Sequence, residues 1–144
     1  KGASASFFVI RQWLDNGRMS LWPHEDVAQL ACAKRDGFEI GTVRTVLAYN
    51  SCVDASGDGG HLSIWDLEPD DECRKAFNVA ETGYPYPPDR LIGVRRLSVR
   101  LEPGDVYFLN ASFLHGVESV RGGRRITAGR FIGLCDTNKA VYWT

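Results

Sequence analysis

The residues best suited to metal chemistry are three histidines and one closely spaced carboxylate. His24 and Asp26 are two positions apart at the end of an expected strand, and alternate residues of an extended chain point to the same face. His115, far along the chain, adds a second imidazole. Two histidines and one carboxylate, with other coordination positions left open, form the facial ligand set of non-haem iron(II). The pattern therefore predicts a metal site made of His24, Asp26 and His115.

His61 is the alternative first ligand, because it also precedes His115 in an expected strand. Its neighbour two positions on is Ser63, which is not a carboxylate. A complete ligand set built on His61 would have to recruit another residue, for instance Asp66. The pattern therefore favours a surface histidine beside a turn at this position.

An anion-binding pair follows His115 in the sequence. The segment 113–131 is expected to form two short strands joined by a tight turn at Gly122–Gly123. Arg125 and Thr127 would then share one face of the second strand. A guanidinium pairs with a carboxylate through two hydrogen bonds, and a threonine hydroxyl can donate another. The pattern predicts that these two side chains bind the carboxylate of a small molecule.

Two further residues could take part in binding that anion. Arg124 would point to the opposite face of the strand, and it becomes the anchor only if the register shifts by one residue. Tyr49 lies on an expected buried strand and is a candidate hydrogen-bond donor to the same molecule.

Short β-rich segments separated by turn signals predict an all-β core. A helix is expected over residues 69–80, where Pro69 stands near the start and acidic residues fill the first turn. Residues 54–60 are expected to form a polar, glycine-rich loop, and residues 27–39 have no clear pattern. We expect strands at 7–14, 18–22, 41–50, 61–67, 96–101, 106–109 and 140–143, the first two forming a hairpin around Asp15–Gly17. A jelly roll with a minor helix is the architecture that this pattern favours.

Composition narrows the class of protein. A chain of 144 residues fits a single domain, and a formal net charge of -1 indicates no nucleic-acid-binding surface. The four cysteines have no Cys-x-x-Cys spacing, so we expect reduced thiols in a cytoplasmic protein. No apolar run approaches the roughly 18 residues of a membrane span. The first residue is Lys1, so a fragment of a longer chain is expected.

These residues and several further motifs resemble the Fe(II)/2-oxoglutarate-dependent dioxygenases. The resemblance spans about residues 18–131. The matching motifs, in order, are His24-x-Asp26, Gly59-Gly60-x-Leu62-x-x-Trp65, the segment 101–109 (LEPGDVYFL), His115-Gly-Val and Arg125-x-Thr127. Each motif is weak alone, and their shared order makes the resemblance specific.

The resemblance implies a double-stranded β-helix, Fe(II), 2-oxoglutarate as co-substrate, O2, and release of succinate and CO2. In this family His24, Asp26 and His115 would bind iron, and Arg125, Thr127 and Tyr49 would bind the co-substrate. The long interval between His24 and His115 is similar to the branch that hydroxylates free amino acids and other small metabolites. Carrier-independent halogenases of that branch have glycine in place of the ligand aspartate. Because this chain keeps Asp26, hydroxylation of an unactivated C–H bond is the expected reaction.

Members of the branch have helices ahead of the barrel that cover one sheet. We therefore expect residues 1–144 to form one jelly-roll domain that lacks those helices. Two alternatives remain at this point: a hydroxylase of a peptidyl side chain, and a non-catalytic, cupin-like module that binds a metal. The substrate and the oligomeric state do not follow from the sequence.

Overall fold

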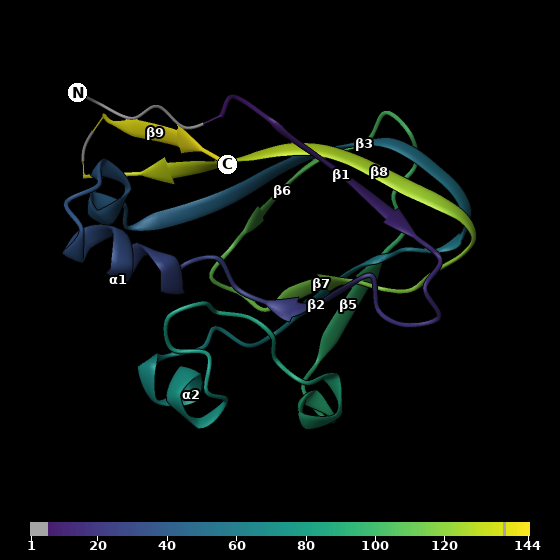
Figure 1. The fold of residues 1–144 in the computed structure, drawn as a ribbon, viewed down its shortest axis with the longest axis horizontal. Coiled ribbons are helices and arrows are strands. Elements are labelled where there is room, and N and C mark those ends of the chain that lie inside the picture. The colour runs from purple at the N-terminus through teal and green to yellow at the C-terminus, as the bar shows by residue number, and fades with distance from the viewer. Residues whose placement is uncertain (1–5, 137) are drawn as a thin grey trace.

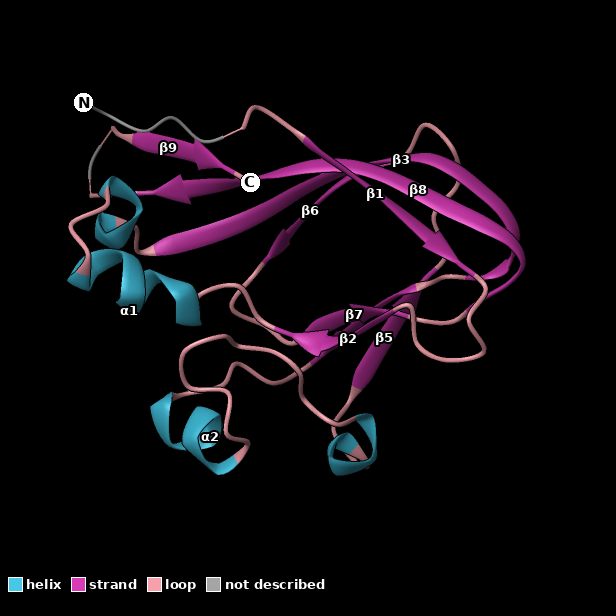
Figure 2. Ribbon diagram, viewed as in Figure 1, coloured by secondary structure: helices cyan, strands magenta, loops and turns pink. Residues whose placement is uncertain are grey.

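The computed structural model describes residues 6–136 and 138–144, whose core is two antiparallel β-sheets (Figures 1 and 2). The large sheet has the order β1 (Val9–Leu14), β8 (Val120–Leu134), β3 (Thr45–Gly59) and β6 (Val106–Asn110), and β9 (Ala140–Trp143) also pairs with β8. The small sheet has the order β2 (Leu21–His24), β7 (His115–Val117), β4 (Leu62–Trp65) and β5 (Arg96–Val99). The predicted all-β core is confirmed.

One pair of chain segments runs through both sheets. In the large sheet β3 pairs with β8 as far as Gly59 opposite Val120. The same segments continue in the small sheet as β4 and β7, where Leu62 lies opposite Val117. Gly59 and Gly60 have φ values of 76° and 65°, in the left-handed region that glycine adopts without strain. The two glycines therefore allow the chain to pass from one sheet to the other.

The hairpin predicted over residues 113–131 is wrong. Gly122 and Gly123 lie inside β8, while β7 pairs with β2 and β4 in the other sheet. A Cβ atom at Gly123 would clash with the carbonyl oxygen of Ser56 on the neighbouring β3. Close approach of two strands, and not a turn, explains the glycine at this position.

Two other local expectations are corrected by the sheet pairing. β1 pairs with β8 and β2 pairs with β7, so the hairpin expected around Asp15–Gly17 does not form. The loop expected at residues 54–60 is largely strand, because β3 extends to Gly59. Its polar residues reflect exposure along this part of the strand rather than the lack of regular structure.

The helices lie outside the sheets, with α1 (Ala28–Arg35) beside the end of the large sheet and α2 (Asp71–Ala76) beyond the small sheet (Figure 2). In the segment without a clear pattern, α1 forms. The short 3-10 helix η1 (Glu39–Thr42) follows it and extends into the start of the strand expected at 41–50, so that β3 begins only at Thr45. Within the predicted helix, α2 is shorter than expected, and the Asp70 carboxylate caps it by accepting from the Cys73 N–H at 2.7 Å. A second 3-10 helix, η2 (Pro88–Leu91), follows.

The core consists of two clusters on opposite faces of the small sheet. The cluster between the sheets joins Val46 and Ala48 of β3 with Leu62 of β4 and Trp143 of β9. The second cluster lies under the segment that contains α2 and η2, and it consists of Trp65, Val79, Tyr86, Leu91 and Leu114. Each face of β4 therefore contributes to the core, through Leu62 on one side and Trp65 on the other.

All four cysteines are free, as predicted. Among the described residues, no helix has the length and apolar character needed to cross a membrane.

Candidate metal centre

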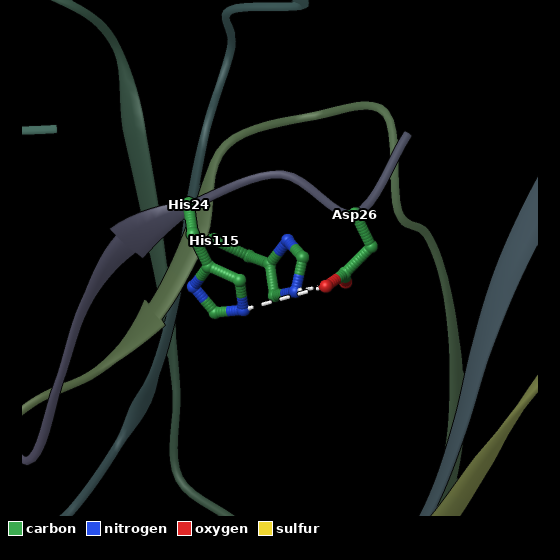
Figure 3. A group of neighbouring side chains, drawn as sticks. All are labelled: His24, Asp26 and His115. Carbon is green, nitrogen blue, oxygen red and sulfur yellow. Dashed lines mark ion pairs between the residues drawn. The ribbon is translucent and has the colours of Figure 1, made fainter. Parts of the chain in front are cut away.

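The structure brings His24, Asp26 and His115 together (Figure 3). His24 ends β2, His115 begins β7, and the two residues are direct partners in the register of these strands. One ligand atom from each of the three residues lies within 4.8 Å of the others. The Nε2 atoms of His115 and His24 lie 3.2 and 3.9 Å from the two Asp26 carboxylate oxygens. Sheet pairing therefore places two imidazoles and one carboxylate around a common point.

Each imidazole is oriented by its own backbone. The Nδ1 atom of His24 lies 3.0 Å from the carbonyl oxygen of Trp22, and that of His115 lies 2.9 Å from the carbonyl oxygen of Phe113. A carbonyl oxygen only accepts, so Nδ1 is the donor in both rings. Both Nε2 atoms therefore face Asp26, and in neutral rings they have lone pairs for a cation.

The pKa values in the cluster reflect burial and mutual charge. Burial, reinforced by the positive charge of His115, lowers the pKa of His24 to about 4. For Asp26, burial opposes ionisation, but the hydrogen bond and charge of His115 outweigh it and lower the pKa. For His115, burial favours the neutral ring, but Asp26 outweighs it and raises the pKa. A bound metal ion would replace the proton through which His115 bonds to Asp26.

Glu25, the residue between the predicted metal ligands His24 and Asp26, holds the turn after β2 in place. Glu25 is buried, and its Oε2 atom accepts from the N–H groups of Val27 and Ala28 at 2.6 and 3.0 Å. These are the first free N–H groups at the start of α1. Its Oε1 atom accepts from the Nε of Arg74 on α2 at 2.8 Å. Both carboxylate oxygens of Glu25 are thus bonded immediately before Asp26.

Arg125 and Thr127 are buried on β8, in the sheet opposite the histidines. The Nη1 atom of Arg125 donates to the carbonyl of Gly60, and its Nη2 donates to the Tyr107 hydroxyl at 3.3 Å. Its Nε has no partner, and in the described part of the chain no carboxylate lies within ion-pair distance of it. A buried cation without an acidic partner is costly, so this site suits an anionic ligand.

The predicted role of Tyr49 is not supported by its position. The Tyr49 ring packs against Phe8 and Phe108, at centroid distances of 6.1 and 5.0 Å, and lies outside the cavity. Its neighbour Asn50 faces the cavity, opposite Tyr107 on β6. Sequence reasoning missed Tyr107. Strand alternation would have found it, because adjacent side chains of a strand face opposite sides of the sheet.

The alternative residues of the sequence analysis lie elsewhere. Arg124 points to the outer face, as alternation predicts, and donates to Asp54 at 2.7 Å. His61 lies beside Ser98 and Glu118, outside the cluster. Register therefore selects Arg125 over Arg124 and separates His61 from the other two histidines.

A single cavity connects the two halves of the site. It has a volume of about 170 Å³, and its walls include the histidine–aspartate cluster from the small sheet and Arg125 and Thr127 from the large sheet. Apolar side chains complete the walls, among them Leu21, Leu62 and Phe131. Such walls exclude water and strengthen electrostatic interactions inside the cavity.

Two antiparallel sheets around a histidine–aspartate cluster are the architecture of a jelly-roll oxygenase. Residues 5–144 match the family described as carrier-protein-independent halogenase WelO5. The chain belongs to this family.

A curated protein and two solved structures are also similar to this chain. The chain is 56% identical over 144 residues to L-isoleucine 3(1)-dioxygenase of Pantoea ananatis (strain AJ13355), covering all of this chain and 49% of that protein. It is also similar to the crystal structure of an N-substituted L-amino acid dioxygenase from Burkholderia ambifaria AMMD, with a TM-score of 0.66 and 19% identity over 95% of this chain and 53% of that one. The complex of that enzyme with alpha-KG (2-oxoglutarate) gives a TM-score of 0.62 and 16% identity, covering 95% and 52%. The chain thus spans about half the length of these relatives. The predicted jelly roll and the resemblance to 2-oxoglutarate-dependent dioxygenases are confirmed.

Proposed function

We propose that this chain forms the catalytic core of an iron(II)- and 2-oxoglutarate-dependent hydroxylase of a free amino acid. The observation that carries the proposal is the composition of one cavity. Its small-sheet wall presents two histidines and Asp26, and its large-sheet wall presents the buried, acid-free Arg125. A metal-bound dicarboxylate would satisfy both walls at once.

The residues fit the groups that this function requires. His24, Asp26 and His115 would bind Fe(II) through two nitrogen atoms and one carboxylate, which leaves positions for further ligands. Arg125 and Thr127 would bind the distal carboxylate of 2-oxoglutarate through charge-assisted hydrogen bonds. When bound, the metal and co-substrate supply the oxidative chemistry that yields succinate and CO2. The protein orients both groups and excludes water from the cavity.

A free amino acid is the substrate class that the observations favour. A relative that is 56% identical bears the name L-isoleucine 3(1)-dioxygenase. L-Isoleucine is therefore the first substrate to test, in competition with a peptide that contains isoleucine.

The test is product formation by the protein supplied with Fe(II), 2-oxoglutarate, O2 and L-isoleucine. We expect succinate together with an amino acid that has gained one oxygen atom, measured by mass spectrometry. The variant Asp26→Ala should lower the rate more than about 100-fold, because it removes a metal ligand. Asp66→Ala, which removes an exposed carboxylate outside the cluster, should leave the rate unchanged. Full activity of Asp26→Ala would refute the assignment of this ligand set.

Halogenation is the second candidate, because the matching family is described as a halogenase family. Asp26 argues against it, since halogenases of this branch have glycine at the ligand position, where a halide can enter. The assay run in chloride should give only the hydroxylated product. A chlorinated amino acid from the unmutated protein would favour the halogenase.

A further inference from the structure

A second arginine, Arg11, lies at the same cavity. Side chains of β1 alternate, so that Arg11 and Trp13 are half-buried and line the cavity while Gln12 is exposed. In the β1–β8 register Arg11 lies opposite Thr127, and Trp13 lies opposite Arg125. The large sheet therefore presents two neighbouring arginines to the cavity.

Arg11 has no acidic partner among residues 6–136 and 138–144. No carboxylate of these residues lies within ion-pair distance of its guanidinium, and no other side chain or carbonyl group accepts a hydrogen bond from it. Arginines on the outer surface behave differently: Arg44, Arg100 and Arg124 each pair with a carboxylate at 2.7 or 2.8 Å. An inward arginine whose donors have no partner in the part of the chain that the structure describes is suited to an anionic ligand.

The two inward arginines hold different places on the cavity wall. Arg125 lies opposite Trp13, and it already donates to the carbonyl of Gly60 and to the Tyr107 hydroxyl. Arg11 lies opposite Thr127 and has neither of these partners. An anion at Arg11 would therefore be a second anion, beside the one at Arg125.

Charge balance indicates what that anion is. The positive charge exceeds the negative charge. Arg11, Arg125 and a divalent ion supply the positive charge, and Asp26 and the two carboxylates of 2-oxoglutarate supply the negative charge. One positive charge is left over near the metal, in a cavity with apolar walls. Uncompensated charge in such a place is costly, and a carboxylate that bonds to Arg11 would offset it locally. A free amino acid supplies that carboxylate, although its ammonium group leaves the net charge unchanged.

We propose that Arg11 binds the α-carboxylate of the amino-acid substrate and so directs its side chain toward the metal. The inference rests on the proposed function and adds the residue that selects a carboxylate-bearing substrate.

The experiment compares Arg11→Gln and Arg11→Lys with Arg124→Gln, which removes an outward-facing arginine of the same sheet. For each variant we would measure kcat and the KM values for L-isoleucine and 2-oxoglutarate. Anaerobic titration of the protein loaded with Co(II) and 2-oxoglutarate would measure L-isoleucine affinity without turnover. L-Isoleucinamide, which keeps the ammonium group but lacks the carboxylate, is the second substrate.

We expect Arg11→Gln to weaken L-isoleucine binding roughly 10- to 100-fold, as loss of a charged hydrogen bond requires. Co(II) affinity and the KM for 2-oxoglutarate should stay within about threefold of the unmutated values. Arg11→Lys should restore part of the affinity, and the preference for L-isoleucine over its amide should shrink in Arg11→Gln. Arg124→Gln should match the unmutated protein.

The outcomes separate the two proposals. If Arg11→Gln raises the KM for 2-oxoglutarate and leaves L-isoleucine affinity unchanged, Arg11 serves the co-substrate and this inference is wrong, while the proposed function stands. If the unmutated protein neither binds 2-oxoglutarate nor turns over an amino acid, both proposals fail.

Discussion

His24 and His115 share one local device at the scale of the single residue. Each ring donates from Nδ1 to the carbonyl oxygen two residues earlier, at 3.0 and 2.9 Å. The bond prevents the ring from turning and leaves Nε2 directed at the cluster. Because the acceptor lies only two residues away in the chain, the ring orientation is set by local backbone structure. Tertiary structure is then needed only to bring the two strands together.

The pKa of His24 makes the stability of the metal-free protein depend on pH. Burial lowers this pKa from 6.5 to about 4, so the unfolded chain binds more protons between these values. The contribution of His24 to stability is therefore complete above pH 6.5 and is lost as the pH falls toward 4. The loss should amount to about 3 kcal/mol. Urea denaturation with a chelator present, at pH 7 and pH 4.5, would measure it.

The matched control for that prediction is the histidine outside the cluster. His24→Gln should flatten the pH dependence between pH 6.5 and 4, whereas His61→Gln should not. An unchanged slope in His24→Gln would show that another group is responsible.

Arg125 and Arg124 provide a second test at the residue scale. They are adjacent in sequence, but one is buried in the cavity and the other pairs with Asp54 outside. Arg125→Gln should raise the KM for 2-oxoglutarate about 100-fold, because it removes a buried charged donor. Arg124→Gln should change this KM less than about twofold. Equal effects of the two variants would contradict the assignment of the anchor.

At the scale of elements, α2 supports the metal ligands although it contributes none. Arg74 on α2 pairs with the buried Glu25, which lies between His24, the last residue of β2, and Asp26. The backbone N–H of Glu25 also donates to the carbonyl of Gly83 at 3.0 Å, and that of Tyr86 donates to the carbonyl of Pro23 at 2.8 Å. The segment that follows α2 therefore fixes the path of the turn that contains His24, Glu25 and Asp26.

Removing the Arg74 side chain should destabilise the fold and loosen the metal site together. Arg74→Ala leaves the Glu25 carboxylate buried without a charge partner, which costs about 3 kcal/mol. Co(II) affinity should fall about 10-fold, as for other groups that orient metal ligands. Urea denaturation and a Co(II) titration followed by absorbance would measure the two effects.

Asp71→Ala is the control, because Asp71 contacts the same arginine from solvent at 2.9 Å and its side chain is 86% exposed. It should cost less than about 1 kcal/mol and leave Co(II) affinity unchanged. If Asp71→Ala and Arg74→Ala behave alike, the ion pair between Arg74 and the buried Glu25 does not support the metal site.

At the scale of the whole molecule, the cavity lies between two sheets that contribute different chemistry. The small sheet carries His24 and His115, and the large sheet carries Arg125 and Arg11. A ligand that binds the metal and the arginines together would connect the two sheets. Binding should therefore stabilise the fold as a whole and not only one loop.

We expect 2-oxoglutarate to raise the thermal stability of the protein only when a metal is present. At a concentration about 100-fold above its dissociation constant, the ligand would add about 2.7 kcal/mol. Anaerobic thermal denaturation with Co(II) would measure the effect. Glutarate, which has both carboxylates but lacks the keto oxygen, should stabilise less. Equal stabilisation without metal, or in Arg125→Gln, would argue against a ligand that spans the two sheets.

Local patterns predicted the strand content well and the strand partners poorly. Residues 96–99 and 106–110 form strands close to the expected positions, yet each pairs with a distant segment. The turn signals at residues 15–17 and at Gly122–Gly123 do not join neighbouring strands. Turn propensity is a local property, whereas in this fold the chain often crosses between sheets. Consecutive strands such as β4 and β5 do pair, but β1 and β2, or β7 and β8, lie in different sheets.

The sequence by itself determined the residue types of the site and the faces on which they lie. The spacing of His24 and Asp26 and the alternation that separates Arg125 from Arg124 follow from the geometry of an extended chain. Only the tertiary structure decided that His24 pairs with His115, that Tyr107 and not Tyr49 contacts Arg125, and that Arg11 enters the same cavity. These relations depend on sheet pairing between segments far apart in the chain, and no local pattern encodes that pairing.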